Sequence, residues 1–187
     1  MRNPFRILLA FILCAGLISS ASAAELYGKK FKDKFEVKST AFELKGLGLK
    51  TYFMIRVFVA GLYLGEGVKT TDALKDVPKR LEVAYFIKIP GKKLAVETRR
   101  RIKLNTTPEE YKKIKNRVDV MDGFFVDLKA GDRYILTYVP SVGTSFSYND
   151  KTVGTIKGAD FARALFAIWL GQNPISPALK DKLLGID

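Results

Sequence analysis

Residues 52–64 read YFMIRVFVAGLYL, and this stretch decides which kind of fold the sequence can adopt. It is rich in aromatic and β-branched side chains and carries a single charge, on Arg56. A strand that is apolar on both faces is stable only where both faces are covered. The pattern therefore predicts a buried central strand within a sheet that other parts of the chain cover.

Further strands are predicted on both sides of this one. Residues 36–44 alternate in β-type and apolar side chains, and the glycines at 46 and 48 are expected to end that strand. Residues 29–34 are polar and basic, which predicts an ordered lead-in or a frayed end. The remaining predicted strands are residues 81–89, 133–139, 145–148 and 152–156.

The helices are predicted from their start signals and their apolar faces. Thr107, Pro108 and Glu110 supply a capping hydroxyl, a proline at the first position and a carboxylate at the third. Residues 160–170 (DFARALFAIWL) are apolar almost all round, which predicts a buried helix. The other predicted helices are residues 71–77, 91–104, 108–120 and 177–184.

Together these elements predict an α+β fold, with a large antiparallel sheet and helices packed on one face. The chain has 187 residues, which fits one domain spanning residues 25–187. Its apolar content of 48% excludes a disordered chain. A chain of this size can fold without disulfides or a structural metal.

The first 24 residues are predicted to be a secretory signal peptide. Two arginines precede an uncharged stretch at residues 7–18, and small residues follow at 20–24. The apolar stretch is too short to span a bilayer, which needs about 20 residues. We therefore expect export, to the periplasm or beyond, after cleavage near Ala23 or Ala24.

Composition excludes several kinds of chemistry. The chain has no histidine, and its one cysteine, Cys14, lies in the predicted signal peptide. This excludes Ser–His and Cys–His catalytic pairs and zinc sites built on histidine or cysteine. Asp119, Asp122 and Asp127 lack the spacing of a calcium loop, so no metal and no cofactor is predicted.

The chain is basic, with 32 Lys and Arg against 19 Asp and Glu and a net charge of +13. Nucleic acid is not predicted as a partner, because no recognition motif is present and the basic residues are spread along the chain. Two interpretations stay open: a solvated basic surface, or one that attracts anionic lipid or acidic ligands.

Three stretches stand out in order and spacing: 46–50 (GLGLK), 56–64 (RVFVAGLYL) and 158–185. Together they resemble the chalcone isomerase superfamily, and the stretches at 130–132 and 138–144 resemble its bacterial, exported branch. The resemblance covers nearly all of the chain after the signal peptide. It implies an open-faced β-sandwich, a large antiparallel sheet with helices packed on it.

The resemblance also implies positions for a site. The family's arginine after the glycine turn matches Lys50, and its strand threonine, a tyrosine in the fatty-acid-binding branch, matches Phe58. The family's tyrosine and asparagine on the next helix match Leu94 and Arg101, and the threonine on the buried helix matches Ile168. None of these positions keeps the family's residue, so cyclisation of chalcones is not expected.

We therefore predict an exported, non-catalytic domain that binds a hydrophobic, anionic small molecule of the fatty-acid type in the cleft between sheet and helices. Lys50 would supply the charge as a point donor. Since Phe58 cannot donate a hydrogen bond, Arg56 or Arg101 would be the second donor. The sequence is equally consistent with a solvent-exposed Lys50 that binds no ligand. Phe58 and Ile168 would then be ordinary residues of the hydrophobic core.

Two other functions remain open on the sequence. An isomerase or intramolecular lyase acting on a phenolic or enone substrate would use Lys50 or Arg101 to stabilise a developing anion. A basic envelope protein would bind anionic lipid or an acidic partner. Trp169, with Phe161, Leu165 and Phe166, either lines a ligand cavity or packs in the core.

Overall fold

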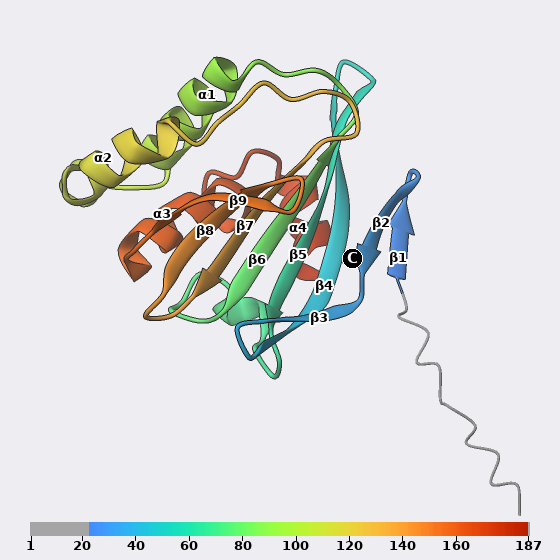
Figure 1. Cartoon of the computed structure of the whole chain (residues 1–187), viewed down its shortest axis with the longest axis horizontal. Coiled ribbons are helices and arrows are strands. Elements are labelled where there is room, and N and C mark those ends of the chain that lie inside the picture. Colours follow the sequence, from blue (N-terminus) through green and yellow to red (C-terminus); the bar gives the residue numbers. More distant parts are fainter. Residues whose placement is uncertain (1–22, 187) are drawn as a thin grey trace, which may run out of the picture.

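The computed structural model describes residues 23–186, which form a seven-stranded antiparallel sheet, a separate two-stranded hairpin and four α-helices (Figure 1). Every strand of the large sheet pairs with its neighbours in sequence. This confirms the predicted α+β fold. The strands are β1 (Ala23–Leu26), β2 (Lys29–Lys32), β3 (Lys34–Val37), β4 (Thr40–Tyr52), β5 (Ile55–Gly65), β6 (Lys79–Tyr85), β7 (Arg133–Val139), β8 (Gly143–Tyr148) and β9 (Lys151–Ile156). The helices are α1 (Gly91–Leu104), α2 (Pro108–Asp122), α3 (Ala159–Leu170) and α4 (Pro177–Leu184), with a 3-10 turn at Thr70–Asp72.

The prediction that glycines 46 and 48 end a strand is wrong, because β4 continues through both to Tyr52. A Cβ on Gly46 would lie 2.1 Å from the Lys182 carbonyl oxygen, and one on Gly48 would lie 2.5 Å from Leu179 Cδ1. The two glycines therefore let α4 pack directly against the strand.

Other elements also differ from the prediction. The strand predicted at 36–44 is divided by a turn at Lys38 and Ser39, and the strand predicted at 52–64 begins only at Ile55, after a turn at Phe53 and Met54. The predicted lead-in at 29–34 contains strand β2, and Phe31 within it is buried. The predicted helix at 71–77 is only the short 3-10 turn. The strand predicted at 81–89 ends at Tyr85, and Ile89 makes an isolated bridge to Leu128.

The helices follow their predicted signals closely. Helix α1 has the predicted bounds, and the capping box at the start of α2 joins Thr107 and Glu110 in both directions. In α4 the Ser176 hydroxyl accepts from the Leu179 N–H, and Gly185 ends the helix in the left-handed conformation at φ 65°. Helix α3 is buried along most of its length, as predicted.

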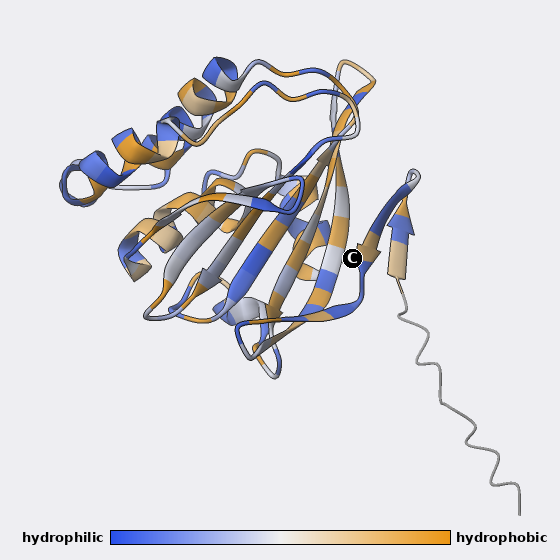
Figure 2. Ribbon diagram, viewed as in Figure 1, coloured by the Kyte–Doolittle hydropathy of each residue, from blue (hydrophilic) through white to orange (hydrophobic). Residues whose placement is uncertain are grey.

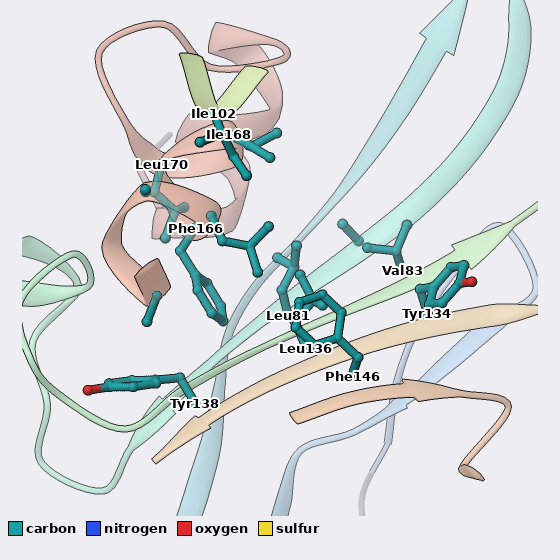
Figure 3. Close-up of a cluster of buried hydrophobic side chains, with 14 of the residues drawn as sticks. Leu81, Val83, Ile102, Tyr134, Leu136, Tyr138, Phe146, Phe166, Ile168 and Leu170 are labelled. Atoms are coloured by element: carbon teal, nitrogen blue, oxygen red, sulfur yellow. The ribbon is translucent and has the colours of Figure 1, made fainter. Parts of the chain in front are cut away.

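The two faces of the sheet carry different cores, because side chains alternate along each strand. On the helix-covered face, Leu81 and Leu136 point toward Phe166 of α3 (Figure 3). On the opposite face, called here the open face, a smaller cluster gathers Phe31, Phe42, Val59, Tyr63 and Ala84. Hydrophobic and hydrophilic residues accordingly alternate along the strands (Figure 2).

The predicted signal peptide falls almost wholly outside the described residues, and its cleavage stays a prediction. Ala23 and Ala24, the residues at the predicted cut, belong to β1, where the Ala24 N–H donates to Asp33 at 2.9 Å. Among the helices of residues 23–186, none is long and apolar enough to cross a membrane.

Candidate functional site: a cavity between the sheet and helices α1 and α3

A cavity of about 250 Å³ lies between the helix-covered face of the sheet and helices α1 and α3. Its walls are mostly apolar, as in most small-molecule sites. Four of the predicted site residues line it: Phe58, Leu94, Arg101 and Ile168. The other lining residues are Val57, Tyr85, Ile89, Lys93, Glu97, Thr98, Trp169 and Ile175.

A second, smaller hollow of about 40 Å³ adjoins the cavity and extends it into the core. The two spaces share Tyr85, Leu94, Thr98 and Trp169 as lining residues. Beyond these, the smaller hollow has an apolar lining of Val83, Phe125, Tyr134, Leu136, Phe146 and Leu165. An elongated apolar group that entered from the larger cavity would therefore end among mostly hydrocarbon and aromatic side chains. The polar atoms nearby belong to Thr98, Trp169 and the tyrosines.

Arg101 supplies a positive charge at the wall of the cavity. Its Nε donates to Glu97 at 2.8 Å and its Nη1 donates to the Pro174 carbonyl oxygen at 3.3 Å, while Nη2 has no hydrogen bond within residues 23–186. Glu97 is shared, because Arg100 also donates to it at 2.6 Å. Hydrogen bonds from Arg100 and then Arg101 hold the pKa of the Glu97 carboxyl below its usual range. This carboxylate therefore stays ionised near neutral pH.

Three uncharged donors line the same space. In the part of the chain that the structure describes, neither the Tyr85 hydroxyl nor the Thr98 hydroxyl makes a hydrogen bond, and the Trp169 indole N–H is buried without an acceptor. Burial raises the pKa of Tyr85, so its hydroxyl remains a donor at neutral pH. Of the three, only the Trp169 N–H is fully buried, and a buried donor without a partner is rare in native structures.

Tyr85 carries a hydroxyl on the strand next to that of Phe58. The two residues are paired across β5 and β6, so their side chains share one face of the sheet. Their rings lie 5.6 Å apart in an edge-to-face arrangement. Sequence reasoning missed Tyr85 because the pairing of two strands separated by a long connection cannot be read from the residues alone.

Lys50 and Arg56 do not line the cavity. Lys50 pairs with Phe58 across β4 and β5 and therefore lies on the same face of the sheet, at the edge of the site. Arg56, one of the two alternatives for the second donor, does not face the cavity: its side chain is exposed, with the guanidinium carbon 4.4 Å from the centre of the Tyr27 ring. The β4–β5 register shifts between Lys50 and Thr51, and this irregularity breaks the simple alternation that would place Arg56 on the same face as Phe58.

Trp169 and Leu165 line the two hollows, whereas Phe161 and Phe166 are packed in the core. The three aspartates considered as calcium ligands have other partners. Asp119 and Asp122 pair with Arg99, and Asp127 accepts from the Gly91 N–H at 2.8 Å.

Another hollow, of about 440 Å³, lies where the turn between α1 and α2 meets α3. Several of its polar side chains pair with one another: Arg163 with Glu110 at 2.6 Å, and Asn105 with the backbone of Asn173. Its lining is more polar than that of the apolar cavity, so it suits a hydrophobic ligand less well.

The comparisons with known proteins agree with this architecture. A family profile described as chalcone isomerase-like matches residues 23–185. Among solved structures, a fatty-acid binding protein of Arabidopsis thaliana superposes with a TM-score of 0.66 at 14% sequence identity, covering 87% of this chain and 96% of that one. No curated protein matches. The chain therefore belongs to the chalcone isomerase-like family.

Proposed function

We propose that this protein is an exported, non-catalytic carrier that holds a fatty acid or a similar hydrophobic anion in the cavity between the sheet and helices α1 and α3. The observation that carries the proposal is one apolar cavity lined both by Arg101 and by Tyr85 and Thr98, whose hydroxyls make no hydrogen bond within residues 23–186. The fold similarity to a fatty-acid binding protein supports the same class of ligand.

The geometry suggests how such a ligand would lie. Thr98 and Arg101 are three residues apart on α1 and so share a helix face. A carboxylate beside them would accept hydrogen bonds from both, and the bond to the charged guanidinium would be the stronger one. The acyl chain would then extend past Leu94 and Trp169 toward the smaller hollow.

The same residues argue against catalysis as the main function. Glu97 is the one carboxylate among the residues that line the cavity, and its two arginine partners keep it ionised and occupied. The chain also has no histidine. A general acid or base poised near neutral pH is therefore absent from the lining residues.

Oleate binding by two neighbouring arginine variants tests the proposal. Arg100 and Arg101 follow each other on α1 and both pair with Glu97, but only Arg101 lines the cavity. We expect Arg101→Gln to weaken oleate binding about ten- to hundredfold, since it removes a charged hydrogen bond. Arg100→Gln should leave the affinity unchanged. Equal affinities for both variants, measured by calorimetry, would contradict the proposed site.

Export is a separate part of the proposal and has its own test. Expression of the full chain in an exporting host, followed by mass measurement of the purified protein, should give a product cleaved near Ala23 or Ala24. A product that keeps its first residues and stays in the cytoplasm would contradict it.

A further inference from the structure

The turn between β4 and β5 exposes a continuous run of large apolar side chains. Tyr52 pairs with Ile55, so the turn itself is the two residues Phe53 and Met54. The exposed fractions are 63% for Tyr52, 81% for Phe53, 96% for Met54 and 57% for Ile55. We call these four residues the hairpin tip. The turn that joins the end of β4 to the start of β5 has the hydrophobic colour in Figure 2.

The two turn residues of the hairpin tip are also unusual for a turn of this type. Phe53 and Met54 have φ values of 45° and 63°, a conformation that bulky residues rarely adopt. The β8–β9 turn has the same length and similar φ values, 44° and 67°, but uses Asn149 and Asp150, which tolerate this conformation. A strained turn built from the least suitable residues indicates a function for those residues.

The surroundings of the hairpin tip are basic. The Arg56 guanidinium lies over the ring of Tyr27, which is 50% exposed, and Lys29 lies 4.9 Å from the centre of the Phe86 ring. The Phe86 N–H donates to the Val57 carbonyl oxygen, which places these groups at the same end of the sheet. Of the segments that meet there, residues 44–65 and 85–96 contain no aspartate or glutamate, whereas the hairpin with Tyr27 and Lys29 contains Glu25, and Asp127 lies beside Gly91.

We propose that this end of the molecule docks on an anionic lipid bilayer, with Phe53 and Met54 entering the acyl layer and Arg56 and Lys29 meeting the headgroups. Exposed apolar residues flanked by cations are the combination that interfacial membrane binding requires. A second copy of the chain fits this surface less well. Its own basic residues would repel these, and four side chains cover far less than the roughly 800 Å² per partner of a stable protein interface.

Docking in this way would bring the cavity to the membrane. Val57 and Ile89 line the cavity, and each lies within a few residues of the basic end just described. The bilayer is a source of fatty acids, so a docked protein could exchange its ligand there. This last step rests on the proposed function, whereas docking itself does not.

Vesicle binding by a turn variant tests docking. The variant Phe53→Asn/Met54→Gly replaces the two turn residues of the hairpin tip by Asn-Gly, the pair that this turn type prefers. It should therefore fold at least as stably as the wild type. Val120→Ser/Val153→Ser is the matched control, because it removes two other exposed apolar side chains, on α2 and β9. Each protein is recovered after export and sedimented with vesicles of phosphatidylcholine, alone or mixed about three to one with phosphatidylglycerol.

We expect the wild type and the control to bind the anionic vesicles, and the turn variant to bind them at least about tenfold more weakly. Binding should also fall as salt is raised, because exposed charges are screened. Unchanged binding by the turn variant, or equal binding to both kinds of vesicle, would overturn the proposal. A dimer seen by light scattering in the wild type and lost in the turn variant would instead identify an interface between copies, and would also overturn it.

A measurement of oleate affinity in the absence of vesicles tells whether a failed experiment concerns membrane docking or the proposed function. The turn variant should bind oleate as the wild type does, because its substitutions lie outside the cavity. Vesicle binding that depends on the tip, in a protein that does not bind oleate, would support docking while refuting the carrier function.

Discussion

Two buried tyrosines, one on each face of the sheet, can be compared directly. One is packed against other rings, and the other lines the cavity. Tyr63 on β5 lies on the open face, fully buried, with its ring 4.9 Å from that of Phe35. Tyr85 on β6 lies on the helix-covered face and lines the cavity. Burial raises the pKa of both hydroxyls. The residue type and the main cause of the raised pKa are thus the same in both, and the two tyrosines differ in what covers each ring.

The open face is closed by stacked rings and paired charges. Arg80 lies over Phe35 and Arg133 lies over Phe31, at 4.5 Å and 4.9 Å from the ring centres. Both arginines also pair with Glu82. The helix-covered face has no such layer near Tyr85, because α1 and α3 leave the cavity between them and the strands.

The largest expected effect is on stability, from the open face. Tyr63→Ala removes a fully buried ring and should lower the free energy of unfolding by about 3–5 kcal/mol, the range for buried aromatic residues. Oleate affinity of the remaining folded protein should not change. Urea unfolding and calorimetry measure the two quantities. A loss of oleate affinity with unchanged stability would reverse the roles assigned to the two faces.

The next effect concerns a buried charge at the other end of the helix-covered face. Lys79 on β6 is 1% exposed, donates to the Lys75 carbonyl oxygen and lies 5.2 Å from the centre of the Tyr138 ring. Burial lowers the pKa of its ammonium from 10.5 to about 8. Between these two values the unfolded chain binds a proton that the folded protein does not, so stability should rise with pH.

Lys79→Met should therefore stabilise the protein at pH 7 by up to about 3 kcal/mol and remove the rise. Unfolding by urea from about pH 7.5 to pH 9 checks this, because the tyrosines of the unfolded chain, with a pKa of about 10, keep most of their protons below pH 9. A wild-type stability that is flat over this interval would show that the Lys79 ammonium is not destabilised by burial.

The smallest effect sharpens the role of Tyr85. Tyr85→Phe keeps the ring and removes only the hydroxyl, so stability should change by less than about 1 kcal/mol. Oleate affinity should fall about three- to tenfold, the cost of one hydrogen bond. The equivalent change on the open face, Tyr63→Phe, is the control and should leave affinity unchanged. Equal affinities of both variants and the wild type would remove Tyr85 from the site.

The fold was predictable from the sequence because its signals are local. The capping box at Thr107, the apolar helix at 160–170 and the alternation at 133–139 depend only on neighbouring residues. The error at Gly46 arose because a glycine within a strand can mark either a break or a close approach. The close approach of α4 comes from residues far away in the sequence.

The site was predictable only in part, for a similar reason. Phe58, Leu94, Arg101 and Ile168 occupy family positions, and the fold brings them to one cavity. Tyr85 and Thr98 carried no signal, since their roles depend on the pairing of β5 with β6 and on the placement of α1. Arg56 stayed an alternative donor because the shift in the β4–β5 register is invisible in the residue pattern.

Native mass spectrometry of the exported protein, purified without detergent, tests the central claim most directly. Leu94 lines both hollows and is only partly buried, so Leu94→Trp should fill the cavity without preventing folding. We predict an added mass of one fatty acid on the wild type, released on denaturation and absent from Leu94→Trp. A wild type that carries no added mass even after incubation with oleate, or an equal added mass on both proteins, would contradict the account.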